Sequence, residues 1–303
     1  GSWTVARMGL APLKRFTRLA SVISSSNLAR RLPRSGLPVE LRELADDFNA
    51  MLERIDAGVR RLSEFSGDLA HEMRTPVATL LGRTQVALSK ARSTEQLREV
   101  LAGNVEELDR LGRLITDMLF LARADEGAAA MASAPVDLAA EAGRVVDYLA
   151  VVAEERGVGV EVQGQAAAQG DRLLIQRALT NLLTNAIRHT DAPGVVRLAL
   201  RQDEAGSTVE VVNRGQGIPA AQLDRVFERF VRLDAARARA EGGIGLGLAI
   251  VRSIMQAHGG TVTAASDATG LTTFTLHFPP LPNAFRGPDA AQRSPAAAPR
   301  IPA

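Results

Sequence analysis

The sequence of 303 residues predicts an all-α segment followed by a mixed α/β domain. Between residues 10 and 119, apolar residues recur in steps of three and four, the period of amphipathic helices. From residue 138 on, helical segments near 138–155 and 171–189 alternate with short strands, which predicts helices layered on one mostly antiparallel sheet. The segment between the two parts, DEGAAAMASAP (125–135), has the small residues and the proline that are typical of a linker.

The composition excludes several kinds of function. With 46% hydrophobic and 23% charged residues, the chain resembles ordinary soluble globular protein. It has no cysteine, which excludes a disulfide framework, a thiolate metal site and a cysteine nucleophile, and which fits a reducing compartment. A net charge of +2 and an aromatic content of 4% give no reason to expect binding to nucleic acid.

The amino-terminal residues indicate whether a membrane anchor is expected. No run approaches the roughly 18 apolar residues that a membrane span requires, so the printed chain is expected to be soluble. Trp3 is followed by four basic residues up to Arg18, as at the cytoplasmic flank of a membrane helix. We therefore expect a membrane anchor upstream of residue 1, and the alternative is a plain amphipathic helix.

Four helices are expected before the linker. Two short ones, at residues 10–28 and 41–55, are joined by RRLPRSGLP, and their narrow apolar stripes favour packing in an oligomer over a monomeric hairpin. A third helix passes through residues 62–80. A fourth follows the capping-box pattern Ser93-Thr94-Glu95-Gln96 and continues to Leu119. The last two would form a hairpin, and two hairpins would form a four-helix bundle.

The third helix contains FSGDLAHEMRTP, in which His71 lies two residues from apolar positions on either side. His71 should therefore point away from the buried stripe and be exposed. Glu72 could accept a proton from one ring nitrogen while the other acts as a nucleophile. Pro76 removes a backbone donor and predicts a bend close to His71. Because Thr75 stands where HExxH has its second histidine, a metalloprotease helix is disfavoured.

The α/β part contains a glycine-rich segment, GGIGLGLAIVRSIMQAHGG (242–260), directly before an apolar helix. Backbone amides at such a junction can bind phosphate, with the helix dipole behind them. The segment lacks the lysine of a P-loop and the spacing of a dinucleotide fingerprint. A glycine-rich helix cap is the alternative.

A second polar motif is NLLTNAIRHT (181–190). Asn181 and Asn185 are four residues apart and share a helix face, where their amide oxygens could bind Mg²⁺. Arg188 lies on nearly the same side and could contact phosphate. The alternative is an ordinary polar helix face.

Two further motifs complete the set. VVNRGQGIP ends a strand and enters a turn in which Gly215 and Gly217 allow a ligand to approach the backbone. VFERFVR precedes LDAARARAEGG, a polar segment that suits a mobile lid carrying Arg237 and Arg239.

These motifs, in this order, resemble those of bacterial sensor histidine kinases over residues 8–280. LAHEMRTP resembles the H box, NLLTNAIRHT the N box, NRGQGIP the G1 box, FERF the F box and GGIGLGLAIV the G2 box. Pro12 and the Gly36 to Glu40 connector resemble a HAMP relay. The resemblance implies a membrane-proximal and HAMP segment (1–57), a dimerisation and phosphotransfer domain (58–124), a linker (125–135), an ATP-binding domain (136–280) and a disordered tail (281–303).

The resemblance also implies roles. His71 would be the phosphoacceptor, Glu72 its proton acceptor, and Thr75 would orient a water in the reverse, phosphatase reaction. Residues 136–280 would form a Bergerat-type α/β sandwich that binds ATP and Mg²⁺. The implied contacts are Asn181 and Asn185 with Mg²⁺, Arg188 with phosphate, Gly243, Gly245 and Gly247 with the triphosphate, and Phe227 and Phe230 as anchors of the lid.

One position departs from the family pattern. The G1 box usually has aspartate where this chain has Asn213. The asparagine oxygen can still accept a hydrogen bond from the adenine amino group, but without charge assistance, so weaker ATP binding is expected. In having asparagine at this position, the chain is similar to the branch of the family that senses copper, silver and related metal ions. This similarity is a reason to expect an active kinase.

The resemblance predicts a homodimeric ATP-dependent kinase, the cytoplasmic part of an inner-membrane receptor. It would phosphorylate itself on His71 and pass the phosphoryl group to an aspartate of a response regulator. One alternative is a non-catalytic signalling scaffold with impaired ATP binding. Another is a kinase that works mostly as a phosphatase.

Overall fold

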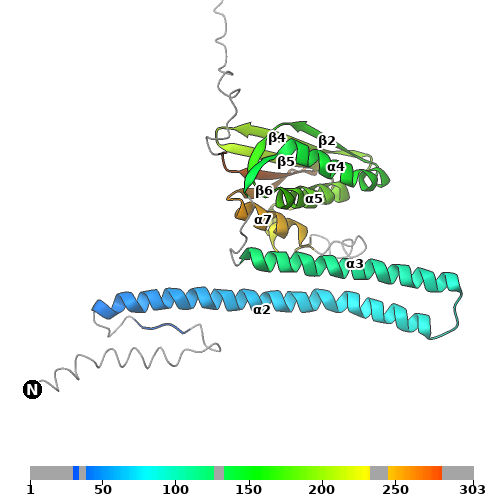
Figure 1. The fold of residues 1–303 in the computed structure, drawn as a ribbon, viewed down its shortest axis with the longest axis horizontal. Helices are drawn as coiled ribbons and strands as arrows, with labels where there is room; N and C mark the ends of the chain where they lie inside the picture. Colours follow the sequence, from blue (N-terminus) through cyan, green and yellow to red (C-terminus); the bar gives the residue numbers. More distant parts are fainter. Residues whose placement is uncertain (1–29, 34–38, 126–132, 233–244, 282–303) are drawn as a thin grey trace, which may run out of the picture. The chain divides into compact units, whose positions relative to one another are not determined.

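A computed structural model describes residues 30–33, 39–125, 133–232 and 245–281 (Figure 1). The chain divides into two units, residues 1–86 and 87–303. Several expected features lie wholly or mostly outside the described residues: the helix at 10–28 with Pro12, the Gly36 to Glu40 connector, the linker at 125–135, the tail, and the polar segment with Arg237, Arg239 and Gly243. No helix in the described ranges is both long enough and apolar enough to cross a membrane.

The first unit is built on one long helix, α2 (Val39–Leu88). Separate helices at 41–55 and 62–80 were expected, and this was wrong, because the helix is continuous. Gly58 is the only helix-breaking residue between them, and one helical glycine costs about 1 kcal/mol relative to alanine. The helix also continues through Pro76. The Asn49 side chain of α2 accepts a hydrogen bond from the backbone nitrogen of Leu32 at 2.8 Å and donates one to the Leu32 carbonyl at 3.0 Å.

The second unit begins with α3 (Thr94–Asp125), whose predicted capping box is confirmed. The backbone nitrogen of Gln96 donates to the Ser93 hydroxyl, and the backbone nitrogen of Ser93 donates to the Gln96 side chain, both at 3.2 Å. These two bonds satisfy backbone donors that the first helical turn leaves without partners.

The predicted α/β domain follows, and its mostly antiparallel sheet is confirmed (Figure 1). Five strands lie in the order β2-β4-β5-β7-β6, and only β2 and β4 are parallel. The strands are β2 (Val158–Gly164), β4 (Gly194–Asp203), β5 (Gly206–Arg214), β6 (Thr261–Ser266) and β7 (Leu271–Phe278). A strand that was not predicted, β1 (Ala134–Asp137), pairs with β3 (Ala167–Gly170) in a separate two-stranded sheet.

Three helices pack against the five-stranded sheet: α4 (Leu138–Glu155), α5 (Arg172–His189) and α7 (Gly247–Ala257). Two short 3₁₀ helices, η1 (Ala220–Gln222) and η2 (Arg225–Phe227), precede α7. Strand β4 shows the pattern of a sheet covered on one side, because Val196, Leu198 and Leu200 are buried while their neighbours are more exposed. Asp137 and Asp171 cap α4 and α5 by accepting bonds from their first-turn amides.

A buried carboxylate joins α4 to α5. Glu141 is 3% exposed, forms ion pairs with Arg144 and, at 3.0 Å, with Arg172, and accepts a hydrogen bond from Gln176 at 2.5 Å. Burial alone would raise the pKa of Glu141, but the hydrogen bonds from Arg144 and Gln176 and the charges of Arg144 and Arg172 together hold it below its ordinary value. The ionised carboxylate therefore stabilises the contact between the helices.

Replacing Glu141→Gln should lower the free energy of unfolding by about 1–3 kcal/mol, since two arginines lose their shared partner. Because the folded-state pKa lies below the ordinary value of 4.5, the carboxylate contributes fully above that pH. The contribution is lost as the pH falls through the folded-state pKa. Urea unfolding at several pH values measures the difference between wild type and variant, which should shrink in acid.

Glu154→Gln is the matched control, because Glu154 is an exposed residue of the same helix. An equal loss in both variants, or a Glu141→Gln loss that grows in acid, would contradict the role given to Glu141.

Candidate functional site

Helix α5 brings together three residues that the sequence singled out. Seven of its apolar side chains are buried, and Asn181, Asn185 and Arg188 lie on the half-buried side of the helix. Steps of four and three residues keep the three side chains within one narrow face. The helix therefore presents two amides and a guanidinium in a row, as predicted.

The start of α7 lies against this face. Gly247 is the first residue of α7, and a Cβ atom there would lie 3.1 Å from the Asn181 side-chain oxygen. Glycine thus permits a close approach that a larger residue would obstruct. The amides at the beginning of α7, a helix of 11 residues, come to lie beside Asn181, where they could bind an anion.

A backbone hydrogen bond connects the F box to the G2 box. The backbone nitrogen of Phe230 donates to the Gly245 carbonyl at 2.9 Å, and Gly245 has φ of 80°. Phe230 itself has φ of 61°, which costs a non-glycine residue about 1–2 kcal/mol. Phe227 is buried, and its ring packs edge-on against the Phe274 ring, with 6.1 Å between the two ring centroids. The residues on either side of segment 233–244 are therefore fixed to each other and to the sheet.

Asn213 lies near the end of β5, where that strand meets the end of α5. It is 4% exposed, and its side-chain nitrogen donates to the His189 carbonyl at 3.4 Å. A Cβ atom on Gly215 would collide with the same carbonyl, so only glycine fits there. Asn213 is thus held at the carboxyl end of α5, with its oxygen available as an acceptor.

Two hydroxyls beside Asn213 were missed in the sequence. Ser266 accepts from the backbone nitrogen of Ile218 at 3.0 Å and lies 3.0 Å from the Thr272 hydroxyl. Thr272 is buried and is the cross-strand partner of Asn213. Threonine and serine are common in strands, so no sequence signal marked these two.

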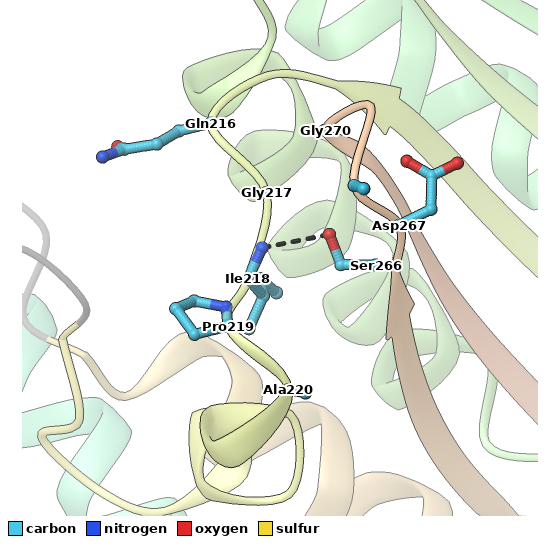
Figure 2. A pocket seen from close by; sticks show the side chains of 9 residues that line it. Gln216, Gly217, Ile218, Pro219, Ala220, Ser266, Asp267 and Gly270 are labelled. Atoms are coloured by element: carbon cyan, nitrogen blue, oxygen red, sulfur yellow. Dashed lines mark hydrogen bonds between the residues drawn. The ribbon is translucent and has the colours of Figure 1, made fainter.

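A shallow pocket of about 390 Å³ lies next to these hydroxyls, between residues 216–220 and the β6–β7 turn (Figure 2). Of the predicted binding residues it includes only Gly217. Asp267 stands in its wall, where hydrogen bonds from the Thr269 hydroxyl and the Leu271 amide lower its pKa. None of Asn181, Asn185, Gly245 and Gly247 lines this pocket, so it does not correspond to the predicted triphosphate site.

In the other unit, His71 is exposed on α2, as predicted. Thr75 is exposed one turn later and shares its face, since residues four apart are neighbours on a helix. Glu72 is half-buried. The histidine can therefore be approached from solvent, with the threonine hydroxyl near it.

Three family models match the chain in sequence order. The HAMP domain model matches residues 4–57, and the His Kinase A (phospho-acceptor) domain model matches residues 61–127. The model of histidine kinase-, DNA gyrase B-, and HSP90-like ATPases matches residues 170–282, which include α5, Asn213 and α7.

Among curated proteins, the sensor protein IrlS of Burkholderia pseudomallei is 45% identical over 278 residues, 92% of this chain and 60% of IrlS. The sensor protein CzcS of Cupriavidus metallidurans is 40% identical over 275 residues, 91% of this chain and 58% of CzcS. The chain thus spans about three fifths of the length of these relatives.

Among solved structures, full-length ShkA in complex with AMPPNP is 29% identical, with a TM-score of 0.53 over 72% of this chain and 45% of ShkA. The order of the motifs, the α/β sandwich and the three family models all indicate the same family. The chain belongs to the family of sensor histidine kinases.

Proposed function

We propose that this chain is the catalytic part of an ATP-dependent protein-histidine kinase that phosphorylates itself on His71. The observation that carries the proposal is the convergence of three elements in the α/β domain. The amide-bearing face of α5 is touched by the start of α7 at Gly247, and the end of α5 is touched by Asn213 of β5. Those are the parts needed to bind a cation, a phosphate chain and a base.

Asn213 would recognise adenine. Its side-chain nitrogen is engaged by the His189 carbonyl, so its oxygen is left to accept a bond from the 6-amino group. Because Asn213 is buried, a base that could not donate this bond would leave the oxygen without a partner, at a cost of about 1–3 kcal/mol. The neighbouring Thr272 hydroxyl would supply a second polar contact.

Asn181 and Asn185 fit Mg²⁺, because it prefers hard oxygen ligands such as amide oxygens. The two amides would hold Mg²⁺ together with phosphate oxygens and water. When bound, Mg²⁺ neutralises phosphate charge and helps to orient the γ-phosphate. Arg188 and the amides of Gly245 and Gly247 would hold the remaining phosphate oxygens.

His71 would attack with an unprotonated ring nitrogen. A nitrogen–phosphorus bond forms as the bond from the γ-phosphorus to the bridging oxygen breaks, and ADP leaves. Glu72 would accept the proton from the other ring nitrogen, which keeps the phosphorylated ring neutral. An aspartate of a response regulator would then take the phosphoryl group on a carboxylate oxygen. In the reverse mode, Thr75 would orient a water that hydrolyses the regulator's phosphate.

A second copy of the chain would cover the apolar stripe of α3. The stripe consists of side chains that are 40–62% exposed and follow steps of four, three, seven and four residues: Leu101, Val105, Leu108, Ile115 and Leu119. A repeat of this kind is typical of helices that pack against a partner helix. Two hairpins would thus form the predicted four-helix bundle.

The remaining features of the proposal rest on the sequence. The domains would run over residues 1–57, 58–124 and 136–280, with a linker at 125–135 and a tail from 281 on. The basic residues after Trp3 support a cytoplasmic position next to a membrane anchor. Asn213 supports a stimulus among copper, silver and related metal ions. The segment with Arg237, Arg239 and Gly243 would close over ATP, anchored by Phe227 and Phe230.

Transfer of labelled γ-phosphate from ATP tests the proposal. The wild type should acquire a label that acid removes and alkali does not, because phosphohistidine hydrolyses in acid. His71→Gln should acquire none, since it has no nucleophilic nitrogen.

His277→Gln serves as the matched control and should be labelled like the wild type, because His277 lies in β7. If the wild type is folded, dimeric and unlabelled in Mg²⁺ and ATP, the chain is a signalling scaffold instead. Label that survives acid would place the phosphate on another residue type.

Asn213 offers a second test. Asn213→Asp should tighten Mg·ATP binding by about two- to tenfold, because the acceptor becomes charged. Asn213→Leu should weaken it about tenfold or more, because the acceptor is lost. Calorimetric titration measures both. If Asn213→Leu binds ATP as well as the wild type, Asn213 does not contact the base.

A further inference from the structure

Arg177 of α5 holds two residues of α3. Its Nη2 lies 2.6 Å from an Asp117 carboxylate oxygen, and its Cζ lies 4.3 Å from the centroid of the Phe120 ring. Helix α3 also contacts α7, whose first residue touches Asn181. We call Arg177, Asp117 and Phe120 the α3 clasp. It links a helix of the phosphotransfer domain to the helix that carries the proposed Mg·ATP ligands.

The position of Arg177 on α5 gives it a second possible partner. Arg177, Asn181 and Asn185 follow one another in steps of four residues, so they form a single row along the helix. Neighbours in such a row have Cβ atoms about 5–6 Å apart. The long, flexible arginine side chain can therefore reach phosphate oxygens bound next to Asn181 as well as Asp117.

The ion pair between Asp117 and Arg177 is weak enough for Arg177 to exchange Asp117 for another anion. Asp117 and Arg177 keep 29% and 27% of their side-chain surface exposed, and an ion pair in such a setting changes an equilibrium by only about two- to fivefold. A triphosphate carries more negative charge than one carboxylate, and guanidinium binds phosphate oxygens in pairs. Phosphate next to Asn181 would therefore compete with Asp117 for the same guanidinium.

We propose that Arg177 exchanges Asp117 for the phosphates of ATP, so that nucleotide binding loosens the attachment of α3 to the ATP-binding domain. The inference rests on the proposed function, because it requires Mg·ATP on α5. Its consequence is that a loaded domain moves more freely to deliver the γ-phosphate to His71. By linkage, the clasp must in turn oppose ATP binding.

Calorimetric titration with Mg·ATP tests the exchange. Asp117→Asn frees the guanidinium and should tighten binding about two- to fivefold. Arg177→Gln should weaken binding, because a phosphate contact is lost. Arg177→Lys should lie between Arg177→Gln and the wild type, since it keeps the charge without the paired donors. The double variant Asp117→Asn/Arg177→Gln should match Arg177→Gln alone.

Asp109→Asn is the control, with the same charge change at an exposed position of α3. Thermal unfolding of each variant separates binding effects from misfolding. If Asp117→Asn leaves affinity unchanged or weakens it, the clasp is a static interface and the exchange is wrong. If the wild type itself binds no Mg·ATP, the proposed function fails, and the inference fails with it.

Discussion

The burial of seven apolar side chains fixes how helix α5 is rotated about its axis, and the placement of the proposed ligands Asn181, Asn185 and Arg188 depends on that rotation. At 100° per residue, burying Leu182 and Leu183 turns Asn181 and Asn185 to the half-buried side of the helix. The beginning of the helix is held by a residue far away in sequence. His258 accepts from the backbone nitrogen of Asp171 at 3.0 Å, and its other ring nitrogen lies 2.7 Å from the Ile254 carbonyl. The imidazole ring thus ties the end of α7 to the start of α5, so that the two helices present their polar groups together.

Because of the same rotation, α5 presents the proposed ligands and also contacts the neighbouring elements β5, α7 and α3. The end of the helix is bonded to Asn213, its middle is touched by Gly247, and its first turns hold Asp117 of α3 through Arg177. A ligand on this face would therefore contact groups that also hold neighbouring elements. Glu141 has a structural role instead: its buried charge stabilises α4 against α5, and its partners Arg144, Arg172 and Gln176 are not among the proposed ligands.

Sequence periodicity was sufficient to predict most of the fold and the side chains that share a face of one helix or strand. The helices at 138–155 and 171–189 and the strands of the large sheet were predicted, as was the exposure of His71. Strand β1 was missed, because four residues with a proline carry no repeat and are stabilised only by pairing with β3. The continuity of α2 was missed because Gly58 resembles a break. Contacts between distant segments, such as Ser266 with Ile218 or Arg177 with Asp117, leave no periodic signal at all.

The central claim is that the face of α5 with Asn181, Asn185 and Arg188 holds Mg·ATP, and Asn185→Ala tests it most directly. Binding of ATP should be measured by calorimetry with Mg²⁺ and with a chelator, for the wild type and the variant. The account predicts that Mg²⁺ strengthens binding to the wild type and has little effect on the variant, because one of two amide ligands is gone. The affinity without Mg²⁺ should be similar in both proteins, which shows that the fold and the adenine site are intact. An equal gain from Mg²⁺ in wild type and variant would contradict the account.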